Sequence, residues 1–127
     1  MTASSQSLST CLIADDHPDF RKVLRDFLPE VTSQVWESEN GAEAVATYER
    51  EHPDLVLMDI SMPEMNGIEA TREIVRRHPD AQVIIVTNFD DPTARDEATA
   101  AGAVGFICKS KLTDLIPVIG SLNDQDA

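Results

Sequence analysis

Cysteine is scarce in this sequence: Cys11 and Cys108 are the only two among 127 residues. They show no CxxC spacing and lie near no pair of histidines, which argues against a zinc site and against a disulfide framework. A domain of this length buries roughly two thirds of the surface that its unfolded chain exposes, so it needs no such staple to fold. We expect both cysteines to be free, buried thiols.

Basic side chains are also scarce, since 10 Lys and Arg stand against 23 Asp and Glu and the formal net charge is −13. Nucleic acids and anionic lipids are held largely by basic side chains, so we expect no direct binding of nucleic acid by this chain. Three of the ten basic residues, Arg21, Lys22 and Arg25, fall in one short stretch. We expect them to form a solvated helix face, with a kinase or dimer contact as the alternative.

Long apolar runs are absent, because none approaches the roughly 20 residues that cross a bilayer. Residues Met1–Thr10 are rich in Ser and Thr and resemble no signal peptide. We therefore expect a cytoplasmic protein without membrane insertion. The length predicts one domain. Its expected parts are a disordered arm over residues 1–9, the domain over 10–123 and a tail over 124–127.

Five short apolar runs are present instead, and continuous runs of this kind indicate strands buried on both faces. They are Cys11–Ala14, Gln34–Trp36, Leu55–Met58, Val83–Val86 and Val104–Cys108. Stretches of helical period alternate with them five times. The sequence therefore predicts an α/β fold, a single doubly wound parallel sheet covered on both faces by helices through right-handed crossovers.

Each expected helix has a face that we predict to be buried. The first face consists of Phe20, Val23, Leu24, Phe27 and Leu28; the second, in a helix over about Gly41–Glu51, of Ala42, Val45 and Ala46; the third, over about Gly67–His78, of Ile68, Thr71 and Val75. The fourth helix, about Pro92–Ala101, has only small side chains to bury and is expected to pack most loosely. The fifth, which carries Leu112, Leu115, Ile116 and Ile119, should start near Thr113 or Asp114, because Pro117 is tolerated only in a first turn.

The tripeptide His-Pro-Asp occurs three times. The copies at His52 and His78 end helices, because proline disfavours helical backbone in the residue before it, and they predict two similar helix-to-strand returns. The copy at His17 opens the first helix, with Pro18 at a position where the missing N–H costs nothing. We interpret all three as helix boundaries and not as the motif of a J-domain chaperone.

Polar side chains follow the expected strands at the edge of the sheet where sites form in parallel α/β folds. They are Asp15-Asp16 after the first strand, Asp59 after the third, Thr87 in the fourth and Lys109 after the fifth. Converging carboxylates repel one another, so they must take up protons or hold a cation. Such oxygen ligands suit Mg²⁺ shared with a phosphate, and Asp59 on an inner strand is the natural nucleophile for an acyl phosphate.

Taken together, these residues resemble the receiver domain of bacterial two-component response regulators. The resemblance covers about Cys11–Leu122 and includes the runs LMDISMPEMNG, from Leu57 to Gly67, and GAVGFICK, from Gly102 to Lys109. It implies a flavodoxin-like, CheY-like fold with five helices and strand order 2-1-3-4-5. That order separates Cys11 from Cys108 by two strands and excludes a disulfide bond between them.

The resemblance also implies a role for each site residue. Asp59 would accept a phosphoryl group from a histidine kinase or phosphotransfer protein. Mg²⁺ would be held by Asp16, Asp59 and the backbone carbonyl of Ser61, and by Asp15 mainly through a water molecule. Lys109 would bridge to the phosphate. The protein would then be a signalling switch that takes part in its own phosphorylation and dephosphorylation, and not an enzyme.

Two further residues would carry the signal to the surface. Thr87 would move toward the phosphoryl group, and Phe106 would change rotamer behind it, with a plain core aromatic as the alternative for Phe106. The surface of the fourth helix, fifth strand and fifth helix would change, and with it the binding of a downstream protein or of a second copy.

Some residues depart from the usual family pattern. Asn88 stands where a small residue is common and, with Phe89 and Ser61, would modulate access to the phosphorylation pocket. Ser110 replaces the usual proline after Lys109 and becomes an alternative helix cap. The run from Met65 to Ala70 resembles receivers of LuxR or NarL type, which are joined to a DNA-binding domain that we do not find in this chain.

Two competing functions remain at this point. One is a phosphorylation-independent binding module of receiver type, which Asn88 suggests. The other is a haloacid-dehalogenase-like phosphatase, which needs Asp-x-Asp where this sequence has Asp59-Ile60-Ser61.

Overall fold

The computed structural model describes residues 9–28, 32–88 and 91–124. Within them lies one five-stranded parallel sheet of order β2-β1-β3-β4-β5. The strands are β1 (Thr10–Ala14), β2 (Gln34–Ser38), β3 (Leu55–Met58), β4 (Val83–Thr87) and β5 (Gly105–Cys108). Both the doubly wound class and the strand order predicted from the sequence are confirmed.

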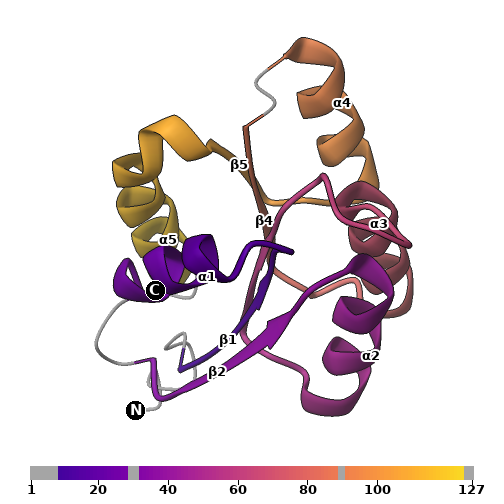
Figure 1. Cartoon of the computed structure of the whole chain (residues 1–127), viewed down its shortest axis with the longest axis horizontal. Helices are drawn as coiled ribbons and strands as arrows, with labels where there is room; N and C mark the ends of the chain where they lie inside the picture. The colour runs from indigo at the N-terminus through magenta and orange to yellow at the C-terminus, as the bar shows by residue number, and fades with distance from the viewer. Residues whose placement is uncertain (1–8, 29–31, 89–90, 125–127) are drawn as a thin grey trace.

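Helices cover both faces of this sheet (Figure 1). They are α1 (Pro18–Asp26), α2 (Gly41–Glu51), α3 (Gly67–Arg77), α4 (Pro92–Ala101) and α5 (Leu115–Asp124). α1 and α5 lie on one face, where Leu24 and Leu115 pack in one apolar cluster, and α2, α3 and α4 lie on the other, where Ala44, Ile74 and Ala98 pack in a second. The inner strands supply buried side chains to both clusters, which explains their continuous apolar sequences. No helix among the described residues is long and apolar enough to cross a membrane.

The expected helix starts are largely confirmed. Pro18 opens α1 in its first turn. Asn66 caps α3 in a capping box with Glu69, in which each side chain accepts a hydrogen bond from the other residue's backbone N–H. α5 begins at Leu115, one or two residues after the predicted start at Thr113 or Asp114, because a 3₁₀ helix occupies Lys109–Asp114. Ser110 lies inside that 3₁₀ helix, so its predicted role as a cap of the fifth helix is wrong.

The prediction of the buried face of α2 is wrong. Ala42 and Ala46 are exposed and Val45 is half-buried, whereas Ala44, Thr47 and Tyr48 are buried. α2 is rotated about its axis so that its own Tyr48 is buried. Burial of this large ring removes more apolar surface from water than burial of an alanine methyl group does. Thr47 can be buried on the same face because its hydroxyl is paired with that of Ser38, with 3.4 Å between the oxygens.

Smaller corrections concern single side chains at the edges of helix faces. Val23 is 38% exposed and Ile116 is 58% exposed, although both were assigned to buried faces. In α3, Ile68 and Thr71 are buried as predicted, whereas Val75 is only half-buried and Ile74 is buried in its place. These residues lie where the apolar stripe of a helix meets solvent, and there the sequence period cannot decide the exposure.

Neither cysteine forms a disulfide bond, and only one of them is buried. Cys11 lies inside β1, where burial raises the pKa of its thiol. Cys108 ends the edge strand β5 and is partly exposed, which contradicts the expectation that both thiols are buried. Strands β3 and β4 separate the two residues, as the exclusion of a disulfide required.

The two His-Pro-Asp copies that end helices adopt different backbones, so the prediction of two similar returns is wrong. His52 ends α2 in the left-handed region at φ 49°, whereas His78 ends α3 at φ −135°. Their rings nevertheless meet, with 4.9 Å between the centroids and with Tyr48 against both. Residues 1–8 and 125–127 of the predicted arm and tail lie outside the described residues, and Ser9 hydrogen bonds with Asp54.

Candidate phosphoacceptor site

The polar residues predicted at the strand ends converge at one edge of the sheet. Asp15 follows β1, Asp59 follows β3, Thr87 ends β4 and Lys109 follows β5. Asp15, Asp59 and Thr87 are 1%, 4% and 0% exposed, because all three lie between the two helical layers. The backbone N–H of Asp59 donates to the carbonyl of Ala14 at 2.9 Å, which extends the pairing of β1 and β3 up to the site.

The position of Asp59 depends on close backbone packing below it. The N–H of Gly67, the first residue of α3, donates to the carbonyl of Ile60 at 2.9 Å. A Cβ atom at position 67 would lie only 1.8 Å from the carbonyl oxygen of Asp59. Glycine is therefore required here, because any side chain would displace the backbone that carries the Asp59 carboxylate.

Lys109 is the cation of the site. Its Nζ lies 2.8 Å from Oδ2 of Asp15 and 3.6 Å from Oδ2 of Asp59, and its side chain is 9% exposed. The same ammonium stands over the ring of Phe20 at 4.3 Å, a cation–π contact. The strand ends thus bring one buried positive charge against two buried negative charges.

The two oxygens of Asp59 have different surroundings. Oδ1 accepts a hydrogen bond from the backbone N–H of Ile60 at 2.9 Å, whereas Oδ2 faces Lys109. The pKa of this carboxyl is raised to about 6, chiefly by burial and also by the neighbouring carboxylates of Asp15 and Asp16, although Lys109 and the Ile60 hydrogen bond lower it. Asp59 is therefore an ionised carboxylate at neutral pH that is poorly solvated.

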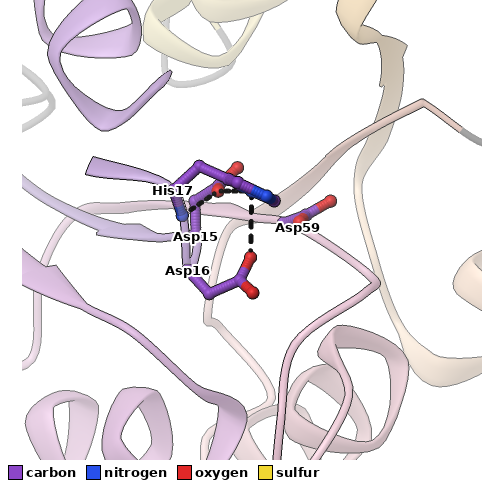
Figure 2. Close-up of side chains that lie close together, drawn as sticks. All are labelled: Asp15, Asp16, His17 and Asp59. Atoms are coloured by element: carbon purple, nitrogen blue, oxygen red, sulfur yellow. Dashed lines mark hydrogen bonds and ion pairs between the residues drawn. The ribbon is translucent and has the colours of Figure 1, made fainter. Parts of the chain in front are cut away.

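His17 joins the carboxylates, which the sequence did not predict (Figure 2). Its Nδ1 lies 3.2 Å from Oδ1 of Asp15 and 3.0 Å from Oδ1 of Asp16, and its backbone N–H donates to Asp15 at 2.8 Å. One potential ligand atom from each of His17 and the three aspartates lies within 4.8 Å of the others. His17 directly follows Asp15-Asp16 in the sequence, which could have indicated a site residue. It was interpreted only as a helix boundary.

The carboxylate oxygens fit a divalent cation. Oδ2 of Asp15 and Oδ1 of Asp16 are buried and accept no hydrogen bond from any described residue, although Lys109 and His17 approach them as ion-pair partners. Buried carboxylate oxygens without donors are costly, and a hard cation with oxygen ligands offsets that cost. The predicted ligands Asp15, Asp16 and Asp59 are therefore brought together in a suitable arrangement.

A depression of about 370 Å³ opens beside these carboxylates, lined by His17, Phe20, Asn88, Lys109 and Ser110. Asn88 was predicted to modulate access, and its exposed side chain at the rim is in a position to do so. Ser61 is also exposed, and Phe89 lies outside the described residues.

Phe106 lies on β5 and is half-buried against the cluster that contains α4. The guanidinium carbon of Arg95, from α4, stands 4.6 Å from the centroid of its ring. The ring is therefore neither a plain core side chain nor a solvated one, since a charged group covers one face of it.

The basic stretch in α1 is not a uniformly solvated face, which corrects the expectation from the sequence. Arg21 is 11% exposed, donates from Nε to Glu37 at 2.6 Å and donates from Nη1 to the backbone carbonyl of Asp15, also at 2.6 Å. Arg25 pairs with the second oxygen of Glu37 and is 45% exposed. Lys22 and Arg25 are exposed as predicted, and of the three only Arg21 is largely withdrawn from solvent. Arg21 thus ties the first site loop to β2.

Comparison with known proteins agrees with this geometry. The family model "response regulator receiver domain" matches residues 11–119. The chain is 42% identical over 99 residues to the chemotaxis protein CheY of Thermotoga maritima, which covers 77% of this chain and 82% of that protein. It is 37% identical over 108 residues to the transcriptional regulatory protein DegU of Brevibacillus brevis, and this match covers 83% of this chain but only 45% of DegU.

A solved structure shows the same fold. A LuxR-family two-component response regulator from Aurantimonas sp. superposes with a TM-score of 0.83 at 30% identity, covering 92% of this chain and 86% of that one.

Proposed function

Because the chain belongs to the family of response regulator receiver domains, whose general function is phosphotransfer in two-component signalling, we propose that Asp59 is its phosphoacceptor. The donor is the phosphohistidine of a histidine kinase or phosphotransfer protein. The observation that carries the proposal is the arrangement at Asp59, where one buried carboxylate oxygen is held by the Ile60 N–H and the other faces Lys109.

Oδ2 of Asp59 is the attacking atom in this proposal. It forms the new bond to phosphorus while the bond from phosphorus to the donor's imidazole nitrogen breaks, and the electron pair of that bond stays on the nitrogen. The ammonium of Lys109, 3.6 Å from Oδ2, is placed to neutralise charge on the incoming phosphoryl oxygens. The Thr87 hydroxyl, at the end of the adjacent β4, donates to the same group.

Mg²⁺ is the proposed cofactor, held by Asp15, Asp16, Asp59 and the backbone carbonyl of Ser61. When bound, it would offset the charge of the carboxylates and of the phosphoryl group. The buried Asp15 and Asp16 oxygens that lack hydrogen-bond donors support this assignment. A phosphoryl group adds roughly two negative charges beside three carboxylates, which is tolerable only with compensating cations.

The output of the switch is a change in protein contacts. We assign Thr87 and Phe106 to the movement that follows phosphorylation and remodels the surface of α4, β5 and α5. Phe106 already links β5 to Arg95 of α4, so a rotation of its ring changes both elements together. The partner is a downstream protein or a second copy of the chain. The match to DegU covers only 45% of that protein. The output of any longer regulator that contains this chain is therefore also a proposal.

The direct test is incubation with a small-molecule phosphoryl donor and Mg²⁺, followed by intact-mass analysis. The wild type should gain one phosphoryl group, and Asp59→Asn should gain none. Gain of a phosphoryl group by both proteins would place the acceptor elsewhere, and gain by neither would contradict the proposal.

A second candidate, binding of partners without phosphorylation, is favoured by one observation. The exposed Asn88 side chain lines the depression through which a donor reaches Lys109 and so narrows that approach. Equal partner affinity of wild type and Asp59→Asn, with and without donor, would support this candidate.

A further inference from the structure

Among the residues that the structure describes, the imidazole of His17 is the nitrogen donor that joins the carboxylates of Asp15, Asp16 and Asp59 (Figure 2). We propose that Nδ1 of His17 is an additional ligand of the proposed metal site, on which this inference rests. This ligand changes the preference of the site toward divalent ions that bind imidazole. Carboxylate and carbonyl oxygens suit Mg²⁺, whereas imidazole suits first-row transition ions such as Co²⁺, Ni²⁺ and Zn²⁺. His17 is then the residue that determines metal specificity.

The distances agree with a shared ion. Neighbouring ligands of an octahedral ion bound at about 2.1 Å lie about 3.0 Å apart. Nδ1 lies 3.0 Å from Oδ1 of Asp16 and 3.2 Å from Oδ1 of Asp15. Nδ1 therefore already stands at a ligand separation from each of the two carboxylate oxygens.

Hydrogen bonding alone does not satisfy these groups. Nδ1 pairs in hydrogen-bond geometry with Asp15, and the buried Oδ1 of Asp16 accepts no hydrogen bond from any residue that the structure describes. A single proton on Nδ1 serves one carboxylate at a time. A cation among the three atoms satisfies both carboxylates and the nitrogen lone pair together.

The backbone holds His17 in place before any ion binds. The residue precedes Pro18, which restricts it to the extended region, and its φ and ψ are −105° and 109°. Its N–H is bonded to Asp15, and its carbonyl accepts from the N–H groups of Phe20 and Arg21 in the first turn of α1. Although 67% of its side chain is exposed, the imidazole extends from an anchored backbone, so little ordering is needed on binding.

The test compares Co²⁺ and Mg²⁺ binding by calorimetry at pH 8, because an imidazole ligand must be deprotonated. The variant is His17→Gln, which retains a polar side chain at an exposed position. The matched control is His52→Gln, a histidine at the end of α2, among the rings of Tyr48 and His78. We expect His17→Gln to weaken Co²⁺ binding on the order of tenfold while Mg²⁺ affinity changes less than about twofold, and His52→Gln to change neither.

NMR of histidine-labelled protein gives a second readout, independent of affinity. Paramagnetic Co²⁺ should shift the imidazole signals of His17 far from their usual range in wild type and in His52→Gln. Normal Mg²⁺ binding with the same Co²⁺ preference in His17→Gln would overturn this inference alone. Failure of both ions to bind the wild type would overturn it together with the proposed metal site.

Discussion

Lys109 makes its closer ion pair with Asp15, at 2.8 Å, and not with the proposed phosphoacceptor. The 3.6 Å separation from Asp59 leaves the second carboxylate less compensated, and burial raises the pKa of Asp59 although Lys109 lowers it. Lys109 thus interacts with two carboxylates that follow neighbouring strands, and its interaction with Asp59, the proposed phosphoacceptor, is the weaker of the two.

Replacement of Lys109 tests its role in the reaction. Lys109→Ala should slow phosphorylation of Asp59 about 10²-fold, because one preorganised charge that stabilises the phosphoryl oxygens is lost. Initial rates of phosphoryl incorporation, measured by intact mass, give the comparison. Lys111→Ala, an exposed lysine two residues later, should react at the wild-type rate. A wild-type rate for Lys109→Ala would remove the lysine from the proposed mechanism.

The raised pKa of Asp59 predicts a pH-dependent cost in stability. The folded protein binds this proton more tightly than the unfolded chain does, so ionisation of Asp59 destabilises the fold above about pH 6. The cost is relieved as pH falls through about 6 toward the ordinary value of 3.8. Asp59→Asn should therefore be more stable than wild type at pH 7.5, by on the order of 3 kcal/mol, and the difference should shrink toward pH 4.

Urea unfolding at several pH values measures this difference. Asp96→Asn, which removes an exposed aspartate from α4, is the control and should show no comparable gain at pH 7.5. A constant difference between Asp59→Asn and wild type from pH 4 to 7.5 would contradict the prediction.

Two glycines on helices should respond to alanine in opposite directions. Gly67→Ala places a Cβ atom 1.8 Å from the Asp59 carbonyl oxygen and should destabilise the fold by about 3 kcal/mol while displacing the site. Gly120→Ala, in α5, meets nothing within 4 Å and should stabilise by about 0.5 to 1 kcal/mol, because glycine weakens helix interiors. Thermal unfolding gives the change in stability of each variant. A change of the same sign in both variants would contradict the packing at Gly67.

Arg21 and Arg25 form a matched pair, since both bind Glu37. Arg21→Gln should cost about 2 kcal/mol, because it removes the hydrogen bonds of a guanidinium that is only 11% exposed, one to the Glu37 carboxylate and a part-buried one to the Asp15 carbonyl. Arg25→Gln should cost less than about 0.5 kcal/mol, because its ion pair is exposed to solvent. Chemical unfolding of both variants distinguishes them. Equal losses of unfolding free energy in the two variants would show that the hydrogen bond from Arg21 to the Asp15 carbonyl does not contribute to stability.

The sheet and its reactive edge could be predicted because the strands are buried on both faces. A continuous apolar run such as Leu55–Met58 can end only where the chain leaves the core, and the next residue, Asp59, is then at the edge of the sheet. The same reasoning found Asp15 and Lys109. These positions follow from sequence order and from the parallel direction of the strands.

The buried face of α2 could not be predicted in the same way. Alanines occur on several sides of this helix, so the apolar period gave no single direction. The ring of Tyr48 decides the rotation through its contacts with His52 and His78, and His78 comes from another helix. His17 escaped prediction for a related reason, because a helix-opening residue and a site residue look alike in sequence.

The sequence by itself determined the α/β class, the strand order through its family resemblance, and the set of carboxylates, hydroxyl and lysine at one edge. Those features depend on local burial and chain order. Tertiary structure alone decided that Lys109 lies closer to Asp15 than to Asp59, that Arg21 binds the first site loop, and that His17 meets two carboxylates. The physical reason is that these contacts depend on distances of a few ångströms between side chains on different elements, which no sequence spacing fixes.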